Sequence, residues 1–272
     1  MSQEPYLSVV IPAYNEAERI PLTLIDIDRH LSSAPYTYEI LVVNDGSRDK
    51  TAEVVRGMAA TIKNLKLVDN ARNQGKGGVV RQGMLLAKGQ VRIFTDADNS
   101  TSIDQFAQMI PFFSSGRTSP EAMPAARGGS SSGGQGYQVV IGSRAIRGAS
   151  LDPPQPLYRQ IPGKIGNLLI QILLLPGLWD TQCGFKAFTA EAAEKVFTLS
   201  QIHGWAFDVE VLALAKRLGY RIKEVPVHWV NNLLSRVTAM SYLKFLLETF
   251  KIRWWFWTSH YDLGADSKPS LP

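Results

Sequence analysis

Two acidic residues, Asp96 and Asp98, stand one residue apart at the end of an apolar run in the segment RIFTDADNST. The run Val91–Thr95 predicts a buried strand, and carboxylates at a strand end can share one divalent cation as hard oxygen ligands. Asp, Asn and Ser also form ordinary turns. From this segment alone, both a metal site and a turn remain open.

The same segment is similar to a second kind of site. An Asp-x-Asp motif after an apolar strand is the nucleophile motif of haloacid-dehalogenase-type phosphatases. In this chain Ser100 stands at the fifth motif position, where those enzymes have Thr or Val. The segment also follows three earlier predicted strands instead of lying on the first. Both departures disfavour a phosphatase nucleophile.

Strands and helices alternate in the part of the chain that leads to these acids. The apolar runs predict strands at Leu7–Ile11, Glu39–Val43, Leu65–Val68 and Val91–Thr95. The segments between them predict helices at Glu16–Leu31, 50–60 and Val79–Lys88. This alternation indicates an α/β domain with a Rossmann-like, mainly parallel sheet that is flanked by helices.

Polar side chains follow several of these predicted strands. Ligands of such sheets bind beyond the carboxyl ends of the strands, and Asn15, Glu16, Asp45, Asp96 and Asp98 all follow a strand end. We therefore expect them to meet at one edge of the sheet, which favours the metal site over a plain turn.

A glycine-rich segment, NARNQGKGGVVRQG at 70–83, joins the third strand to the next helix. Backbone amides at a helix N-terminus favour anions, and Lys76 and Arg81 could add positive charge for a diphosphate. Gly77 stands where a Walker A loop has Ser or Thr. A purely structural turn is therefore the alternative interpretation.

The second half of the chain carries further charged candidates. Asp180, Asp208 and Glu210 have the chemistry of a general base, but ion-paired carboxylates have the same composition. Four basic residues surround a proline-rich loop and indicate either a phosphate clamp or a solvated basic surface. They are Arg144, Arg147, Arg159 and Lys164.

Composition limits the class of protein. The chain has 272 residues, of which 45% are hydrophobic and 19% charged, as in ordinary globular proteins. A net charge of +5 suits an anionic substrate or a membrane surface and is too small to indicate nucleic-acid binding. The single cysteine, Cys183, excludes an intrachain disulfide. We expect no signal peptide in MSQEPYLSVVIPAYNE.

Three regions lie outside the predicted sheet. Residues 114–136 are dominated by Ser, Gly and Pro and predict a flexible insertion in a domain spanning 1–237. Residues 238–259 predict an amphipathic helix, and a disordered tail is expected at 260–272. No segment has the ~18 uncharged apolar residues of a spanning helix.

The amphipathic helix carries a recurring apolar stripe beside basic residues. Trp and Phe together with Lys and Arg are typical of a helix that lies on a membrane. A terminal helix packed on the core would show the same spacing. The stripe consists of Met240, Leu243, Leu247, Phe250, Trp254 and Trp257.

The motifs SVVIPAYNEAERI, ILVVNDGSRDKT, FTDAD and VIGSR together resemble the family 2 inverting glycosyltransferases of the GT-A fold. The resemblance covers residues 7–237 outside the insertion. NQGKGG and DTQCGFKAF are most similar to the dolichyl-phosphate β-glucosyltransferase branch. Polyprenyl-phosphate mannosyltransferases are similar overall but more often have a Gly-Leu-Gly loop in place of NQGKGG.

The resemblance implies roles at the matching positions. Asp96 and Asp98 would bind Mg²⁺ or Mn²⁺ on the donor diphosphate, and Arg144 would contact phosphate. The residues expected at the sugar nucleotide are Pro12, Tyr14, Glu16, Asp45, Lys76, Asp180 and Gln182. Those expected at the acceptor phosphate are Arg159, Lys164, Ser235 and Arg236, although the glycine that relatives more often have before the Ser-basic pair is missing.

The resemblance also implies a reaction. Glucose would move from UDP-glucose to a dolichyl or polyprenyl phosphate with inversion, giving a β-linked glucosyl lipid. A lipid phosphate is already ionised and needs no general base. Two alternatives remain: mannose transfer from GDP-mannose, or a non-catalytic module that binds sugar nucleotides. We expect a peripheral protein at the cytosolic face of the endoplasmic reticulum membrane in a eukaryote, or of the plasma membrane in a prokaryote.

Overall fold

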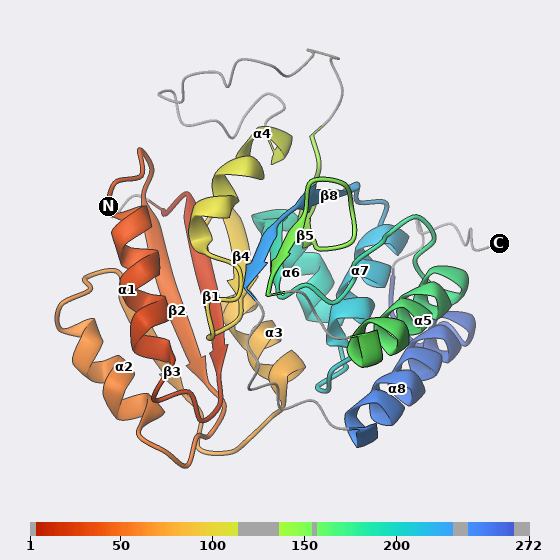
Figure 1. Cartoon of the computed structure of the whole chain (residues 1–272), viewed down its shortest axis with the longest axis horizontal. Helices are drawn as coiled ribbons and strands as arrows, with labels where there is room; N and C mark the ends of the chain where they lie inside the picture. The colour runs from red at the N-terminus through yellow and green to blue at the C-terminus, as the bar shows by residue number, and fades with distance from the viewer. Residues whose placement is uncertain (1–3, 114–135, 154–156, 231–238, 264–272) are drawn as a thin grey trace.

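The computed structural model describes residues 4–113, 136–153, 157–230 and 239–263. The predicted insertion therefore lies outside the described residues apart from Gly136, and Ser235 and Arg236 lie outside them as well. A seven-stranded mixed sheet has the order β3-β2-β1-β4-β7-β5-β8 (Figure 1). Its strands are β1 Leu7–Ala13, β2 Tyr38–Asn44, β3 Leu65–Asp69, β4 Val91–Thr95, β5 Val139–Ser143, β7 Phe185–Thr189 and β8 Ile222–Pro226.

Strand direction divides the sheet into two parts. β1 pairs in parallel with β2 and β4, and β2 with β3, so the four strands predicted first have their carboxyl ends at one edge. β7 is antiparallel to both β4 and β5. Thr95 of β4 pairs with Phe185 of β7. This register places the residue after Thr95 beside the residue before Phe185, which matters for the site.

Helices cover both faces of the sheet. On one face, α1, α2 and η1 pack over the apolar side chains of β1 and β2, and on the other lie α3, α6 and α7. Their bounds are α1 Ile20–Leu31, α2 Thr51–Ala59, α3 Lys76–Leu86, the 3-10 helix η1 Ile103–Gln108, α4 Ile110–Phe113, α5 Leu157–Leu173, α6 Ala190–Leu199, α7 Phe207–Arg217 and α8 Ala239–Trp257. Two short strands, β6 Ser150–Asp152 and β9 His228–Val230, pair separately and were not predicted as a sheet.

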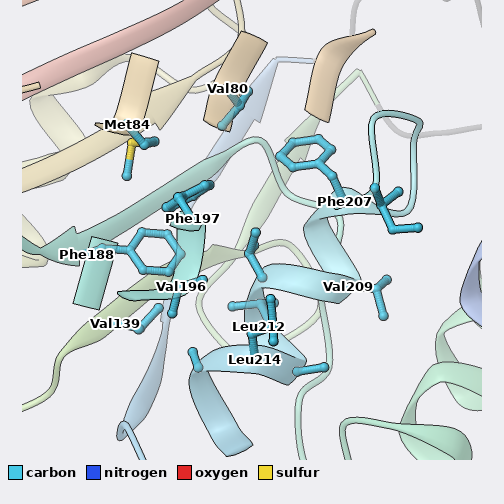
Figure 2. Packing of buried hydrophobic residues seen from close by; sticks show 14 of the residues in the cluster. Val80, Met84, Val139, Phe188, Val196, Phe197, Phe207, Val209, Leu212 and Leu214 are labelled. Carbon is cyan, nitrogen blue, oxygen red and sulfur yellow. The ribbon is translucent and has the colours of Figure 1, made fainter. Parts of the chain in front are cut away.

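The strands are apolar on both sides because both faces are covered. Val10, Val43 and Phe94 belong to the cluster under α3, α6 and α7, whereas the residues directly before them belong to the cluster on the opposite face. Figure 2 shows Phe188, Phe197 and Phe207 within the first cluster, together with Val80 and Met84 of α3. The rings of Phe188 and Phe197 lie 5.2 Å apart, edge to face. The strands that lead to the candidate site are therefore held by closely packed side chains on both faces of the sheet.

The predicted α/β class and mainly parallel sheet are confirmed, but two helix starts differ from the sequence prediction. α1 begins at Ile20 instead of Glu16: the Glu16 carbonyl accepts from the N–H groups of Arg19 (3.0 Å) and Ile20 (2.9 Å), so a turn over 17–19 leads into the helix. α3 begins at Lys76, earlier than predicted.

The start of the predicted disordered tail, at residue 260, is also too early. Tyr261 is buried, at 4% exposure, and its hydroxyl donates to Glu210 Oε1 (2.7 Å). His260 stacks on Trp255, with ring centroids 4.8 Å apart. The packed chain therefore continues past residue 260, and residues 264–272 lie outside the described part.

Helix α8 turns most of its predicted apolar stripe outward. Leu243, Leu247, Phe250, Trp254 and Trp257 are all exposed, Trp257 at 76%. The inward side of the helix uses other residues, among them the fully buried Thr249 and Ile252. The alternative interpretation, in which the stripe packs on the core, is therefore contradicted for these five residues.

Helix α5 lies beside α8 and adds to the exposed apolar surface (Figure 1). Its contribution is Ile165, Leu168 and Ile172, each more than half exposed. We call these three residues and the five exposed residues of the α8 stripe the α5–α8 face. Within the described parts of the chain, no helix is long and apolar enough to cross a membrane.

Candidate active site

Asp96 and Asp98 directly follow the central strand β4, where the sequence predicted a metal site. Each side chain is about one quarter exposed or less, at 25% for Asp96 and 22% for Asp98. Lys76 Nζ lies 2.6 Å from Asp96 Oδ1, and an Arg19 guanidinium nitrogen lies 3.6 Å from Asp98 Oδ2. Asp98 Oδ1 also accepts the backbone N–H of Ser100 (3.1 Å), so the turn interpretation holds as well. The two acids therefore lie in a turn and also form an anionic centre, in which each carboxylate faces a basic side chain. We call Asp96 and Asp98 the anionic centre.

Gly184 makes room for Asp96. The β4–β7 register brings the two residues together, and a Cβ on Gly184 would lie 2.5 Å from Cγ and 2.8 Å from Oδ1 of Asp96. Carbon atoms in ordinary contact are ~3.5–4.0 Å apart. Any larger residue at position 184 must therefore displace the Asp96 carboxylate.

The glycine-rich turn before α3 is packed against the segment before α7. A Cβ on Gly75 would lie 3.2 Å from the carbonyl carbon of His203, and one on Gly77 would lie 2.7 Å from Cβ of Phe207. The N–H of Gly77 donates to His203 O (2.9 Å). These contacts support the structural interpretation of the turn, because that amide already has a protein partner.

Asp45 accounts for two further amides of the same turn. Its carboxylate accepts from the backbone N–H groups of Gln74 (2.5 Å) and Gly75 (3.1 Å). Burial raises the pKa of Asp45 above its ordinary value, although both amides act in the opposite direction. The strand end of β2 thus fixes the turn that carries Lys76.

Lys76 lies between charged and aromatic groups. Its Nζ lies 5.9 Å from the ring centroid of Trp205 and 5.8 Å from that of Phe207. Burial would lower the pKa of Lys76, but the charges of Asp96 and Asp208 raise it above the ordinary value. Lys76 is therefore cationic at neutral pH. Arg81 is not part of this site, because its guanidinium donates to Phe197 O (2.8 Å) at the end of α6.

Arg144 and Asp180 form a rigid pair at the opposite half of the sheet. Arg144 donates to both oxygens of Asp180, at 2.7 and 2.9 Å. Burial opposes both charges, yet the Arg144 guanidinium keeps the pKa of Asp180 below its ordinary range. Trp229 of β9 covers the Arg144 guanidinium, with its ring centroid 4.6 Å away. Asp96 is close enough for its charge to raise the pKa of Arg144, after the larger effects of burial and Asp180.

A further ion pair lies close to Asp96 and was missed in the sequence. Lys186 of β7 is fully buried, pairs with Asp208 and donates to Cys183 O (2.6 Å). Burial raises the pKa of Asp208, and the two nearby lysines oppose that shift. A lysine within the apolar strand FKAFT was the available signal for this pair. Asp208 is thus an ion-paired carboxylate, one of the two possibilities left open.

The loops after β1 and β2 are joined by hydrogen bonds near Asp98. Asn15 N–H donates to Ser47 Oγ (2.9 Å), and Asn15 Oδ1 accepts from the Arg48 N–H (2.8 Å). Glu16 binds Arg19, which also faces Asp98. The structure therefore brings Glu16 to Asp96 and Asp98 through Arg19, a residue that the sequence analysis did not single out.

The remaining predicted site residues differ in their burial and in their contacts with the residues described above. Pro12 is buried in β1, Tyr14 is 36% exposed just beyond it, and Gln182 is exposed, with its N–H donating to Asp180 (3.2 Å). Arg159 and Lys164 lie on α5, and their side chains are outside the described part.

The acids suit a hard divalent cation that is completed by substrate. Among the described residues, no group of three or more His, Cys, Asp or Glu side chains could hold a metal alone. Mg²⁺ is commonly bound by one or two carboxylates together with water and substrate phosphates. Two carboxylates at one strand end, with Gly184 making room for that of Asp96, fit that kind of site.

Comparison with known proteins shows the family of the chain. The family model described as glycosyl transferase family 2 matches residues 8–123. A dolichyl-phosphate β-glucosyltransferase of Trichomonas vaginalis is 36% identical over 260 residues, covering 93% of this chain and 72% of that protein. The protein of the same name from Saccharomyces cerevisiae is 33% identical, covering 84% of this chain and 67% of its own.

Solved structures share the fold at lower identity. Glucosyl-3-phosphoglycerate synthase from Mycobacterium tuberculosis, in complex with UDP, has a TM-score of 0.61 and 18% identity, covering 92% of this chain and 80% of that one. The mannosyltransferase PcManGT from Pyrobaculum calidifontis, with GDP-Man and Mn²⁺, has a TM-score of 0.54 and 19% identity, covering 92% and 64%. The sequence similarity, over most of both chains, shows that this chain belongs to glycosyltransferase family 2.

Proposed function

We propose that this glycosyltransferase moves glucose from UDP-glucose to a dolichyl or polyprenyl phosphate, with inversion, to give a β-linked glucosyl lipid. The observation that carries the proposal is the agreement of the curated relatives. Proteins from Trichomonas, Dictyostelium, Drosophila, mammals and yeast, at 30% to 36% identity, all bear the name dolichyl-phosphate β-glucosyltransferase. Mannose transfer from GDP-mannose is the competing donor chemistry.

The contacts of the acids support an acceptor that needs no deprotonation. The three carboxylates considered as general bases are all occupied: Asp180 by Arg144, Asp208 by Lys186, and Glu210 by the N–H groups of Gln201 and Ile202 (both 2.9 Å). An alcohol acceptor needs a base, whereas a lipid phosphate is already an anionic nucleophile. The site thus has the chemistry expected for a phosphate acceptor.

The donor is expected to bind at the shared edge of β1, β2 and β4. Asp96 and Asp98 would bind Mg²⁺ or Mn²⁺, which supplies positive charge where the diphosphate leaves. Lys76 and Arg144 would supply further charge from fixed positions, the kind of prearranged stabilisation that contributes most to many enzymes. Pro12, Tyr14, Glu16 and Asp45 would line the nucleotide side, and Asp180 and Gln182 the sugar side.

The acceptor would approach from the membrane. Arg159, Lys164, Ser235 and Arg236 remain the proposed contacts of its phosphate. The α5–α8 face would lie on the cytosolic surface of the membrane, with Lys251 and Arg253 beside its Trp and Phe residues. Exposed aromatic and basic residues on one helix are typical of interfacial binding.

The experiment that tests the activity uses radiolabelled UDP-glucose and GDP-mannose separately, each with polyprenyl phosphate in detergent micelles and Mg²⁺. We expect lipid-extractable label from UDP-glucose, and no label above background when Asp98→Ala replaces the wild type. Label from GDP-mannose alone would replace the donor assignment. Label from neither donor would contradict the proposed reaction.

A further inference from the structure

Helix α8 has a second, inward-facing role that the α5–α8 face does not explain. Glu248 points away from that face, and its Oε2 accepts the backbone N–H of Ala206 (3.0 Å). A Cβ on Gly204 would lie 2.7 Å from Cδ of Glu248. The carboxylate therefore lies directly against the segment 201–206, and any larger residue at position 204 would have to displace it.

The same segment is fixed from two other sides. Glu210 of α7 accepts the N–H groups of Gln201 and Ile202, and Tyr261 donates its hydroxyl to Glu210 (2.7 Å). His260 contacts Gln201 Oε1 (3.0 Å). Three elements thus set the position of segment 201–206: the adjacent helix α7, and α8 and the chain after α8, which are distant from it in sequence.

Segment 201–206 in turn holds the turn that carries Lys76. His203 O accepts from the Gly77 N–H (2.9 Å), and His203 Nδ1 lies 3.1 Å from Gln74 O. Trp205, in the same segment, lies beside Lys76. Lys76 reaches Asp96 at 2.6 Å. A continuous set of contacts therefore leads from Glu248 to the anionic centre.

We propose that Glu248 is a positioning residue for the active site, so that α8 serves the reaction as well as the membrane. Glu248 fixes segment 201–206, this segment fixes the turn at Gln74–Gly78, and the turn places Lys76 on Asp96. The inference rests on the proposed contact of Lys76 with the donor diphosphate. A long side chain placed through three contacts loses its position when one contact is removed, and a misplacement of about 1 Å can cost ~100-fold in rate.

The test compares three variants in the full chain. Glu248→Ala removes the acceptor of the Ala206 N–H, whereas Glu248→Gln keeps an oxygen acceptor at the same length. Thr249→Val, at the adjacent buried position of the same helix, removes only a hydroxyl that bonds Phe245 O (2.8 Å). It controls for general loosening of α8.

Hydrogen–deuterium exchange reports the coupling whether or not the proposed reaction occurs. We expect Glu248→Ala to speed exchange ~10-fold or more in peptides covering 201–206 and 74–78. Glu248→Gln and Thr249→Val should exchange like the wild type. Unchanged exchange at 74–78 in Glu248→Ala would overturn the proposal, as would the same acceleration in Thr249→Val.

Kinetics then show whether Glu248 acts through Lys76. With acceptor in detergent micelles, Glu248→Ala should lower kcat ~10-fold or more, leave the KM for lipid phosphate unchanged, and have little further effect when Lys76 is already Ala. Glu248→Gln should restore most of the rate. If Glu248→Ala lowers kcat by the same factor in the wild type and in Lys76→Ala, the positioning role is refuted. If no donor supports transfer, the proposed function fails and the exchange experiment alone decides the coupling.

Discussion

Replacing Gly184 by Ala should damage the reaction while leaving the fold largely intact. The added Cβ would lie 2.5 Å from Cγ of Asp96, so the carboxylate must move by about 1 Å to reach ordinary contact. The Asp96 side chain can make this movement, because it is the end of a partly exposed side chain and not backbone. Stability should therefore change little.

The functional cost follows from the same displacement. The carboxylate would leave the position in which Asp96 Oδ1 meets Lys76 Nζ, and a misplacement of this size can cost ~100-fold in rate. We expect Gly184→Ala to lower kcat about 100-fold and to weaken Mn²⁺ binding, measured by electron paramagnetic resonance in the presence of UDP. Its urea midpoint should stay near that of the wild type.

A matched glycine gives the control. Gly57 lies inside α2, and a Cβ there meets no atom within 4 Å. Gly57→Ala should keep full activity and stabilise the protein by about 0.5–1 kcal/mol, because alanine is the better helix former. If Gly184→Ala keeps both wild-type turnover and wild-type Mn²⁺ affinity, the assignment of Asp96 as a precisely placed metal ligand is wrong.

Further predictions address the ion pairs, the cysteine and the exposed helix. Lys186→Met should lower the free energy of unfolding in urea by about 3–5 kcal/mol, because it leaves Asp208 buried without its partner. The double variant Lys186→Met/Asp208→Leu should recover most of this stability. An equal loss in the single and the double variant would argue against the pair. Folding lowers the pKa of Asp180, so the wild type should be more stable than Asp180→Asn above about pH 4 and should lose this advantage as the pH falls below about 4. A stability difference between the two proteins that does not change with pH would contradict the lowered pKa. Burial, aided by Asp180, raises the pKa of Cys183 to about 12, so iodoacetamide at pH 8 should label the protein only after unfolding. Trp254→Ala with Trp257→Ala should weaken binding to anionic vesicles ~10-fold or more in co-sedimentation, because each exposed indole offers apolar area to the interface; equal binding would remove the α5–α8 face as the anchor.

Trp255 has a different position from its neighbours and is excluded from the vesicle test. The sequence presents three Trp residues together, but Trp255 stacks on His260 and packs against Tyr261 (5.7 Å between ring centroids). Its replacement would disturb the chain after α8 and, through Glu210, segment 201–206. The helical register thus separates a partly buried residue that packs against the core from two surface residues, which the sequence cannot tell apart without the partner elements.

The sequence by itself determined the parallel half of the sheet and the place of Asp96 and Asp98. Apolar runs of strand length report burial on both faces, and acids at their ends report a shared edge, because both signals depend on local order along the chain. The same local information predicted an apolar stripe on the terminal helix and could not say which side of it faced solvent.

Only the tertiary structure decided which charged and polar groups meet. Lys186 pairs with Asp208 and Glu248 with Ala206 through contacts between elements far apart in sequence. The need for glycine at 184 arises from the antiparallel register of β7 on β4, which no local pattern encodes. Side-chain chemistry is local to the sequence, whereas distance between side chains is set by packing, and the functional roles of Gly184, Lys186 and Glu248 depend on distance.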